Sequence, residues 1–282
     1  MFSVSGPGTR WAAPGLMALA GGSLYVGSAL AVGLFEVFPP AVVAWFRISG
    51  AAVLLLALHR PSLEAFIDSR GFNAAVFGLA TLSMNMLFYE AIARIPMGTA
   101  VAIEFLGPIA VAALGSRSLR DWSALILAGA GVLVISGTVL SDSLSGIAFA
   151  LGAGAAWAAY IVVGSRIAGT AGASWDSLTA GFTWAAVLAL PVMVFFWPAD
   201  ADMPTLNLLG LILGLGLLSA AVPYSLDQIV MRIAGAAYFA VLQAILPIVA
   251  AIVGAIALSQ WLTMAELIGI VLVVAAVALR RP

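Results

Sequence analysis

The sequence predicts an all-α integral membrane protein with ten transmembrane helices, arranged as two inverted five-helix repeats. Three observations indicate this fold class: only 8% of the 282 residues are charged, the mean hydropathy is +1.18, and long uncharged runs recur along the chain. A soluble domain carries about 25% charged residues, whereas runs of roughly 20 apolar residues cross a bilayer as a helix. The function is therefore expected to take place in or across a membrane.

Breaks at charged, proline and glycine-serine positions divide the chain into the expected spans. These are residues 12–35, 41–58, 71–93, 98–115, 121–139, 145–165, 174–197, 206–230, 235–258 and 263–279. The uncharged segment from 233 to 265 is too long for one crossing, so a turn is expected at Ser259-Gln260-Trp261. The connections between spans are short, which leaves little mass outside the membrane.

The arginines are distributed unevenly about these spans. With the N-terminus in the cytoplasm, nine arginines fall at inner ends or loops and only Arg94 falls outside. Positive residues favour the cytoplasmic side, so both termini are expected in the cytoplasm and the protein in the bacterial inner membrane. A net charge of −1 without a basic cluster argues against nucleic acid as a partner.

Cofactors and metals are not expected from the composition. The chain has no cysteine, which removes disulfides and thiolate metal sites. The single histidine, His59, lies at a helix end, where a structural role is the more common one. The sequence therefore predicts neither a metal site nor a cofactor.

A pattern in the first half of the chain recurs in the second. The segments ARI and EFLGP at residues 93–95 and 104–108 correspond to MRI and QAILP at residues 231–233 and 243–247. Repeats of residues 1–140 and 141–282 would each hold five helices, and an odd number of crossings places the two copies in opposite orientations. Pro108 and Pro247 then fall near the middle of their helices, one turn from Glu104 and Gln243. These two helices are expected to cross near the substrate.

Three segments carry a resemblance to a known family: FYEAIARIPMGTAVAIEFLGP at residues 88–108, GAGAAWAAYI at 152–161 and VPYSL at 222–226. They resemble the drug/metabolite transporter superfamily, specifically the ten-helix type built from two EamA domains, and most closely bacterial threonine/homoserine and aromatic amino-acid exporters. The resemblance implies inward-facing and outward-facing states around a central cavity, with export of small metabolites. Relatives often carry an acidic residue where this chain has the uncharged Gln260-Trp261.

Glu104 is the deepest acidic residue of the predicted spans. A carboxylate at membrane depth costs roughly 2.5 to 3.5 kcal/mol on insertion scales, so its presence needs an explanation. No arginine lies at helical spacing, and the nearest in sequence is Arg94. Glu104 is therefore a candidate to bind a proton or a substrate ammonium. The alternative is a protonated side chain that forms a hydrogen bond with a neighbouring helix.

Other charged residues are candidates for a gate or a charge pair. Arg47 either attracts a substrate carboxylate or pairs with a structural anion such as Glu36 or Glu90. Glu90 and Arg94 have the favourable i,i+4 order near the outer interface, and Asp227 lies with Arg232 near the inner one. Interfacial anchoring is the favoured role for these two pairs, and gating is the alternative.

Polar and aromatic side chains at matching helical positions suit a cavity for amphipathic solutes, with packing as the alternative. The candidate substrate-binding residues are Asn85, Tyr89, Glu104, Pro108, Trp157, Tyr160, Tyr224, Gln228, Gln243 and Pro247.

Taken with the resemblance, these features predict a secondary transporter that exports amino acids and similar small metabolites by alternating access, with lipid around it and protons as a candidate coupling ion. A multidrug or nucleotide-sugar carrier on the same scaffold is the alternative. An integral membrane enzyme is a further alternative, but the acids are scattered and the histidine is peripheral. The sequence has no Walker motif, so ATP is not the direct energy source.

Overall fold

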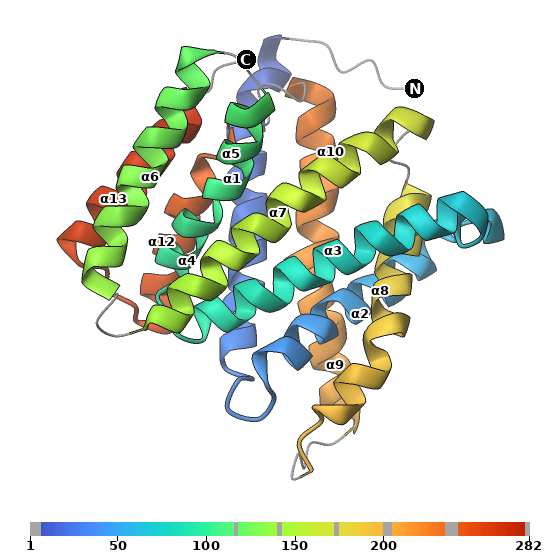
Figure 1. Ribbon diagram of the computed structural model, residues 1–282. Coiled ribbons are helices and arrows are strands. Elements are labelled where there is room, and N and C mark those ends of the chain that lie inside the picture. Colours follow the sequence, from blue (N-terminus) through green and yellow to red (C-terminus); the bar gives the residue numbers. More distant parts are fainter. Residues whose placement is uncertain are drawn as a thin grey trace.

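The computed structural model describes residues 7–115, 118–139, 143–171, 175–199, 205–234 and 242–279, and every regular element in these ranges is a helix (Figure 1). The elements are α1 (Pro7–Val32), α2 (Pro40–His59), the 3-10 helix η1 (Leu63–Ala65), α3 (Asp68–Ile92), α4 (Met97–Glu104), α5 (Leu106–Gly115), α6 (Leu119–Val139), α7 (Leu144–Ala171), α8 (Trp175–Phe195), α9 (Thr205–Gly216), the π-helix η2 (Leu217–Ala221), α10 (Val222–Ala234), α12 (Ile245–Leu258) and α13 (Met264–Leu279).

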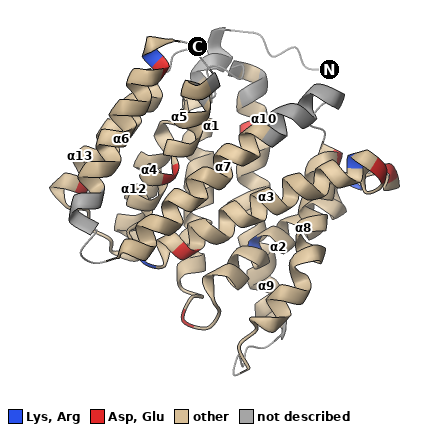
Figure 2. Cartoon of the chain, viewed as in Figure 1, with Lys and Arg blue, Asp and Glu red and all other residues tan. Residues whose placement is uncertain are grey.

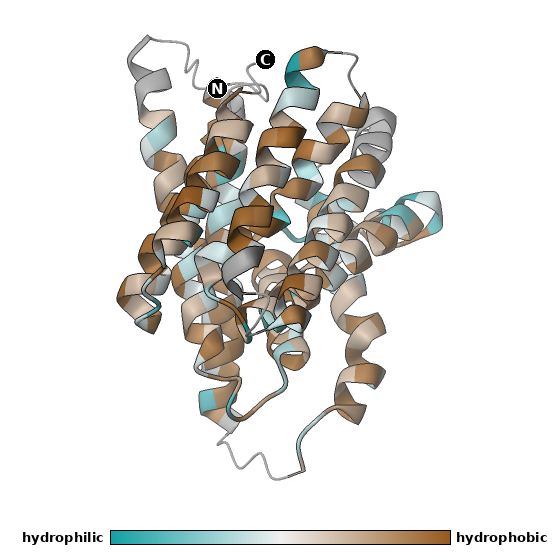
Figure 3. Cartoon of the chain, turned by 60° about the vertical axis from the view of Figure 1, so that its left-hand side comes forward, coloured by the Kyte–Doolittle hydropathy of each residue, from teal (hydrophilic) through white to brown (hydrophobic). Residues whose placement is uncertain are grey.

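The helices have the composition of membrane spans. Within the described residues, six helices are long and apolar enough to cross a bilayer, and shorter apolar helices cover Met97–Val111, Ile245–Leu258 and Met264–Leu279. Large apolar side chains on the outside, such as Leu58 at 71% exposed and Ile126 at 72%, would face lipid. Figure 2 shows that most charged positions drawn lie at helix ends, and Figure 3 shows apolar colouring along most of the helical surface. The chain is a multi-pass membrane protein.

Three helices that the sequence predicts as continuous are interrupted next to a proline. The expected span 98–115 divides at Phe105 into α4 and α5, the span 206–230 contains the π-helix η2, and the last turn before α12 lies at residues 243 and 244. Proline has no N–H to donate to the carbonyl four residues earlier and its ring crowds that carbonyl. For Pro108, Pro223 and Pro247 those carbonyls belong to Glu104, Ser219 and Gln243, which lie at the three interruptions. The first part of the span 235–258 lies outside the described residues.

The central packing brings the α4–α5 break against α7. Helix α7 packs on α3, α4 and α5. A Cβ on Gly154 of α7 would lie 2.8 Å from the Glu104 carbonyl oxygen, and one on Gly107 would overlap the Gly154 carbonyl. Only glycine permits this approach of two helix backbones. The glycine-rich segment of α7 therefore determines where Glu104 lies.

The remaining helices surround this centre. Helix α2 packs on α8 and α9, and α1 packs on α10 and α12. The π-helix is held against α1, because the Ser23 hydroxyl donates to the Leu218 carbonyl oxygen at 2.6 Å. Helices α6 and α13 pack along each other at one edge of the bundle (Figure 1), away from most of the other helices.

Candidate functional site

Arg47 lies inside the bundle, on α2, with 4% of its surface exposed. No described residue accepts a hydrogen bond from its buried Nε. The guanidinium carbon lies 5.9 Å from the ring centroid of Tyr89 on α3, within the range of a cation–π contact. A buried arginine with an unpaired donor is costly unless an anion reaches it. Arg47 therefore stays a candidate for binding a group that carries negative charge.

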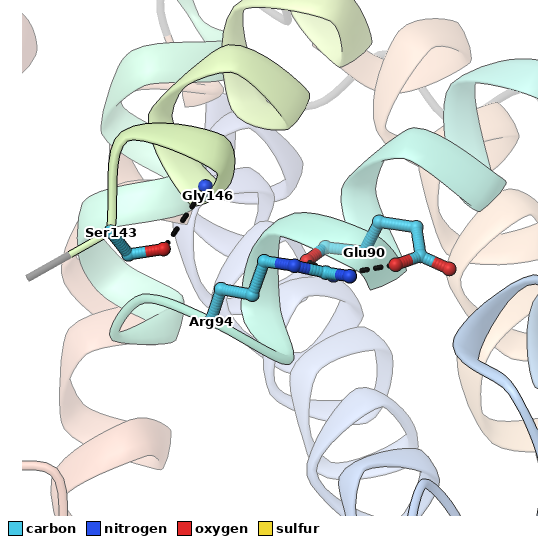
Figure 4. Close-up of polar contacts among 4 residues, drawn as sticks. All are labelled: Glu90, Arg94, Ser143 and Gly146. Carbon is cyan, nitrogen blue, oxygen red and sulfur yellow. Dashed lines mark hydrogen bonds and ion pairs between the residues drawn. The ribbon is translucent and has the colours of Figure 1, made fainter.

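The structural partners that the sequence suggests for Arg47 are not found. Glu90 instead forms an ion pair with Arg94, which also donates to the Glu90 carbonyl oxygen (Figure 4). The Arg94 guanidinium lies over the Phe149 ring. In the described part of the chain the other ion pair is between Glu64 and Arg70. Arg47 thus has no carboxylate within ion-pair distance among the described residues.

Glu104 is the last residue of α4 and is 8% exposed. The charge of Arg47 acts on it across the interior. The sequence places no arginine at helical spacing from Glu104, and Arg47 acts on it from another helix. The two residues belong to different helices, α4 and α2, so only the fold brings the charge of Arg47 to act on Glu104. The interior of the bundle thus holds a basic and an acidic side chain.

Asp227, on α10, belongs to the same region. The charges of Asp227, Arg47 and Glu104 all act on Tyr25 of α1 and on Tyr224 of α10. The Asp227 Oδ1 atom is buried and accepts no hydrogen bond from a described residue. The interfacial pairing with Arg232 that the sequence favours stays a prediction, because the Arg232 side chain lies outside the described part of the structure. We call Arg47, Glu104, Asp227, Tyr25 and Tyr224 the buried charge cluster.

Aromatic rings surround the buried charge cluster on several helices. Tyr89 is fully buried, and its hydroxyl has no hydrogen-bond partner among the described residues. Tyr224 packs edge-on against Phe182 at 5.6 Å between ring centroids. Tyr160 of α7 lies 4.7 Å from Phe77 by the same measure and is influenced by the charge of Asp227. Tyr89, Tyr160 and Tyr224 thus bring rings from three helices into the range of Arg47 or Asp227.

Other predicted site residues have structural partners. Trp157 packs edge-on against Phe105, at the break between α4 and α5, with ring centroids 5.0 Å apart. The Asn85 side-chain amide donates to the Thr81 carbonyl oxygen of its own helix at 2.7 Å. Asn85 is 2% exposed, so this bond satisfies a buried donor.

The proline-bearing segments carry the rest of the predicted site. Pro108 lies in the first turn of α5, and Pro247, which is buried, lies in the first turn of α12. Gln243 lies in the turn before α12 and is half-buried. The side chain of Gln228 lies outside the described residues. Which of these side chains reach the buried charge cluster stays a prediction.

The Glu90–Arg94 pair lies at the end of α3, apart from the buried charge cluster. The two side chains are 19% and 35% exposed. Ser143 lies close by and caps α7, since its Oγ accepts from the Gly146 N–H at 3.1 Å (Figure 4). The partial exposure of the pair agrees with interfacial anchoring rather than with substrate binding.

The structure offers no metal site in the residues it describes, where no group of three or more histidine, cysteine or acidic side chains comes together. His59, at the end of α2, stacks on Trp175 with ring centroids 4.5 Å apart and planes inclined by 13°. This packing gives His59 the structural role that the sequence favours.

Sequence reasoning missed two parts of the interior. Tyr25 lies in an apolar helix without any local signal, and only the fold brings it to Arg47 and Glu104. Glu266, in the first turn of α13, is 4% exposed and accepts a hydrogen bond from Thr99 of α4 at 3.0 Å. Glu266 is not among the residues that the sequence predicts for the site. The T-x-x-E pattern at Thr263–Glu266 was the signal that could have identified this helix start.

Comparisons with known proteins agree with this picture. The model of the EamA-like transporter family matches residues 144–280. The threonine/homoserine exporter RhtA of Salmonella typhimurium is 33% identical over 264 residues, which cover 93% of this chain and 88% of that protein. RhtA of Escherichia coli (strain K12) is 32% identical with the same coverage. A solved crystal structure with 19% identity has a TM-score of 0.64 and covers 96% of this chain and 97% of that one, which shows the likeness of fold alone.

Proposed function

Because the chain belongs to the EamA-like transporter family, we propose that it is a secondary transporter that exports amino acids and similar small metabolites by alternating access. Its similarity to threonine/homoserine exporters supports small polar amino acids, such as threonine and homoserine, as the first substrates to test. On this proposal it acts as a carrier without ATP or a cofactor, and not as an enzyme.

The observation that carries the proposal is the buried charge cluster. An amino acid carries a carboxylate and an ammonium on one carbon, and Arg47 together with Glu104 and Asp227 offers groups complementary to both. Arg47 Nε and Asp227 Oδ1 are buried without described partners. A zwitterion would satisfy both atoms, whereas an apolar solute would leave them unsatisfied.

The aromatic residues complete this proposed site. Tyr89 and Tyr224 supply hydroxyl groups next to the charges, and Trp157 and Tyr160 supply ring faces from α7. Such a mixture of rings and a few polar groups is typical of small-molecule pockets. It suits substrates with one zwitterionic end and a small side chain.

We further propose the ten-crossing, inverted-repeat architecture. If residues 1–140 and 141–282 correspond, α1 matches α7, α2 matches α8, α3 matches α9–α10 and α6 matches α13. The packing of α3 on α7 then recurs as α10 on α1, that of α3 on α8 as α9 on α2, and that of α5 on α7 as α12 on α1. Helices α2 and α6 also pack on their own counterparts, α8 and α13, and α4 packs on α12, which belongs to the span that corresponds to α4–α5. A two-fold relation between the halves requires both kinds of pairing.

The proposed orientation follows from the arginine distribution, with both termini in the cytoplasm. Helix α1 begins and α13 ends on the same side of the bundle (Figure 1), which supports an even number of crossings. On this orientation the start of α4 and the start of α13 face the outside.

Reconstitution tests the proposed function directly. Purified protein in liposomes would be given labelled threonine, homoserine, phenylalanine, a lipophilic cation or a nucleotide sugar, each with and without a pH gradient. We expect saturable uptake of threonine and homoserine that unlabelled amino acid competes away, and acceleration by the gradient would identify protons as the coupling ion. Transport of the lipophilic cation or the nucleotide sugar without transport of any amino acid would overturn the proposal.

A further inference from the structure

We propose that an interlock between the start of α4 and the corner between α12 and α13 closes one end of the transport pathway and must open in each cycle. The interlock consists of Met97 and Thr99 on α4 and of Gln260 and Glu266 at the corner. This inference rests on the proposed alternating-access function, and the labelling experiment below gives a result whatever the substrate is.

Two side chains from the corner bind the first turn of α4. The Gln260 Oε1 atom accepts a hydrogen bond from the Met97 backbone N–H at 2.9 Å. That N–H is one of the first four of the helix, which have no partner within the helix. Gln260 therefore caps α4 from a part of the chain 163 residues away, at the position where the family resemblance would have an acidic residue.

Glu266 makes the second connection, and its two carboxylate oxygens accept hydrogen bonds from different residues. Oε2 accepts from the backbone N–H and the hydroxyl of Thr263, both at 2.8 Å, and the Glu266 N–H donates to the Thr263 hydroxyl at 3.2 Å. This capping box begins α13. Oε1 accepts a hydrogen bond from the Thr99 hydroxyl at 3.0 Å. Both residues are buried, since Thr99 is 0% exposed and Glu266 is 4% exposed.

The polar bonds lie next to a close helix contact. A Cβ on Gly98 of α4 would lie 2.9 Å from the Ala251 Cβ of α12, and one on Gly254 would lie 3.7 Å from the Met97 Cβ. Met97 itself is 0% exposed. Water and solutes therefore do not pass between α4 and α12 at this level while the interlock is formed.

The location of the interlock gives it its role. It joins α4, whose other end is Glu104, to helices of the opposite half of the chain. Cap and hydroxyl bonds of this kind break and reform without unfolding a helix, since water replaces them when the contact opens. Separation of α4 from the α12–α13 corner would connect the buried charge cluster with one side of the membrane.

An engineered disulfide tests whether opening is required. The chain has no cysteine, so the variant M97C/G254C contains a single thiol pair, and the 3.7 Å between the two Cβ positions matches the mean of about 3.8 Å in disulfides. We expect the oxidised protein to lose most of its transport and the reduced protein to recover it. The single variants M97C and G254C, treated with the same oxidant, are the controls. Transport by fully cross-linked protein at the rate of its reduced form would overturn the interlock as a gate.

Thiol labelling tests the same opening without any substrate. Met97→Cys places a thiol at the buried position, and a membrane-impermeant maleimide reaches it only when the interlock opens. Adding Thr99→Val removes one hydrogen bond to a charged acceptor without changing the side-chain shape, so labelling should become about tenfold faster or more. Thr179→Val is the matched control, because Thr179 is also 0% exposed but donates to Trp175 of its own helix.

Equal labelling rates with Thr99→Val and with Thr179→Val would contradict the proposed interlock and indicate ordinary helix packing. Failure of the proposed substrates to be transported would leave the labelling result unchanged, so the two proposals fail separately.

Discussion

Replacing Glu104 by glutamine tests the buried charge cluster with the least change in shape. The side chain is 8% exposed at the end of α4, and an amide fills nearly the same volume while removing the negative charge. We expect the variant to insert and fold normally and to export threonine less efficiently, because the substrate ammonium loses a charged partner.

The size of the effect follows from the charge that is removed. The ammonium still donates a charge-assisted hydrogen bond to the glutamine oxygen, so the part that is lost is the attraction between the two opposite charges. At about 4 Å that attraction is worth about 1 kcal/mol in bulk water and more in a medium of lower dielectric constant, which corresponds to a roughly fivefold or larger decrease in kcat/KM. Burial of Glu104 keeps solvent screening small, so the measured loss should lie in this range or above it.

The assay is counterflow of labelled threonine in liposomes that contain equal amounts of correctly inserted protein, over a range of pH. Glu90→Gln is the matched control, since it is the same substitution in a partly exposed pair with Arg94. Such pairs are worth about 0 to 1 kcal/mol, so its effect on kcat/KM should be small. Glu104→Gln protein with the wild-type rate and an unchanged pH profile would refute the role of Glu104.

Three further predictions concern the site, the orientation and the packing. Arg47→Gln should reduce transport of threonine more than that of 1-amino-2-propanol, which lacks the carboxylate, and an unchanged ratio in a competition assay would exclude Arg47 as the carboxylate partner. Single cysteines at Ser62 and Glu36, both exposed in the loops, should be labelled in intact cells only at position 36, and labelling at position 62 alone would invert the proposed topology. Gly154→Ala should lower the free energy of unfolding by about 1 to 3 kcal/mol, because its Cβ would lie 2.8 Å from the Glu104 carbonyl oxygen. Gly210→Ala, with no atom within 4 Å of the new Cβ, should be neutral or stabilising in the same thermal unfolding assay.

Much of the fold follows from local properties of the sequence. The scarcity of charge and the length of the apolar runs predict membrane helices, and the expected spans for α2, α6, α8 and α13 agree with the structure to within two residues or so at each end. The prolines at 108, 223 and 247 also mark the interruptions, because a missing N–H acts within one turn of the chain. The sequence treats the affected helices as continuous, since it does not show whether neighbours will stabilise a bend or a break.

The site residues show the same difference between local properties of the sequence and contacts made by the fold. The sequence identifies Glu104 and Arg47 as buried charges that need an explanation, because the cost of a charge at membrane depth can be read from a single helix. It does not bring them together, and it omits Tyr25, Thr99 and Glu266. Each of these depends on a partner from a distant helix.

The physical reason is that the loss of water around a charged group and the choice of its partner are decided at different levels of structure. The chain itself determines which groups leave water, since hydrophobic length and position along a helix decide their depth. Which groups then meet depends on helix crossings, and these are set by close backbone approaches such as that of Gly154 to Glu104 and by bonds across the bundle such as that of Gln260 to Met97. Only the tertiary structure decides those contacts, because small residues permit a close approach without specifying the helix that makes it.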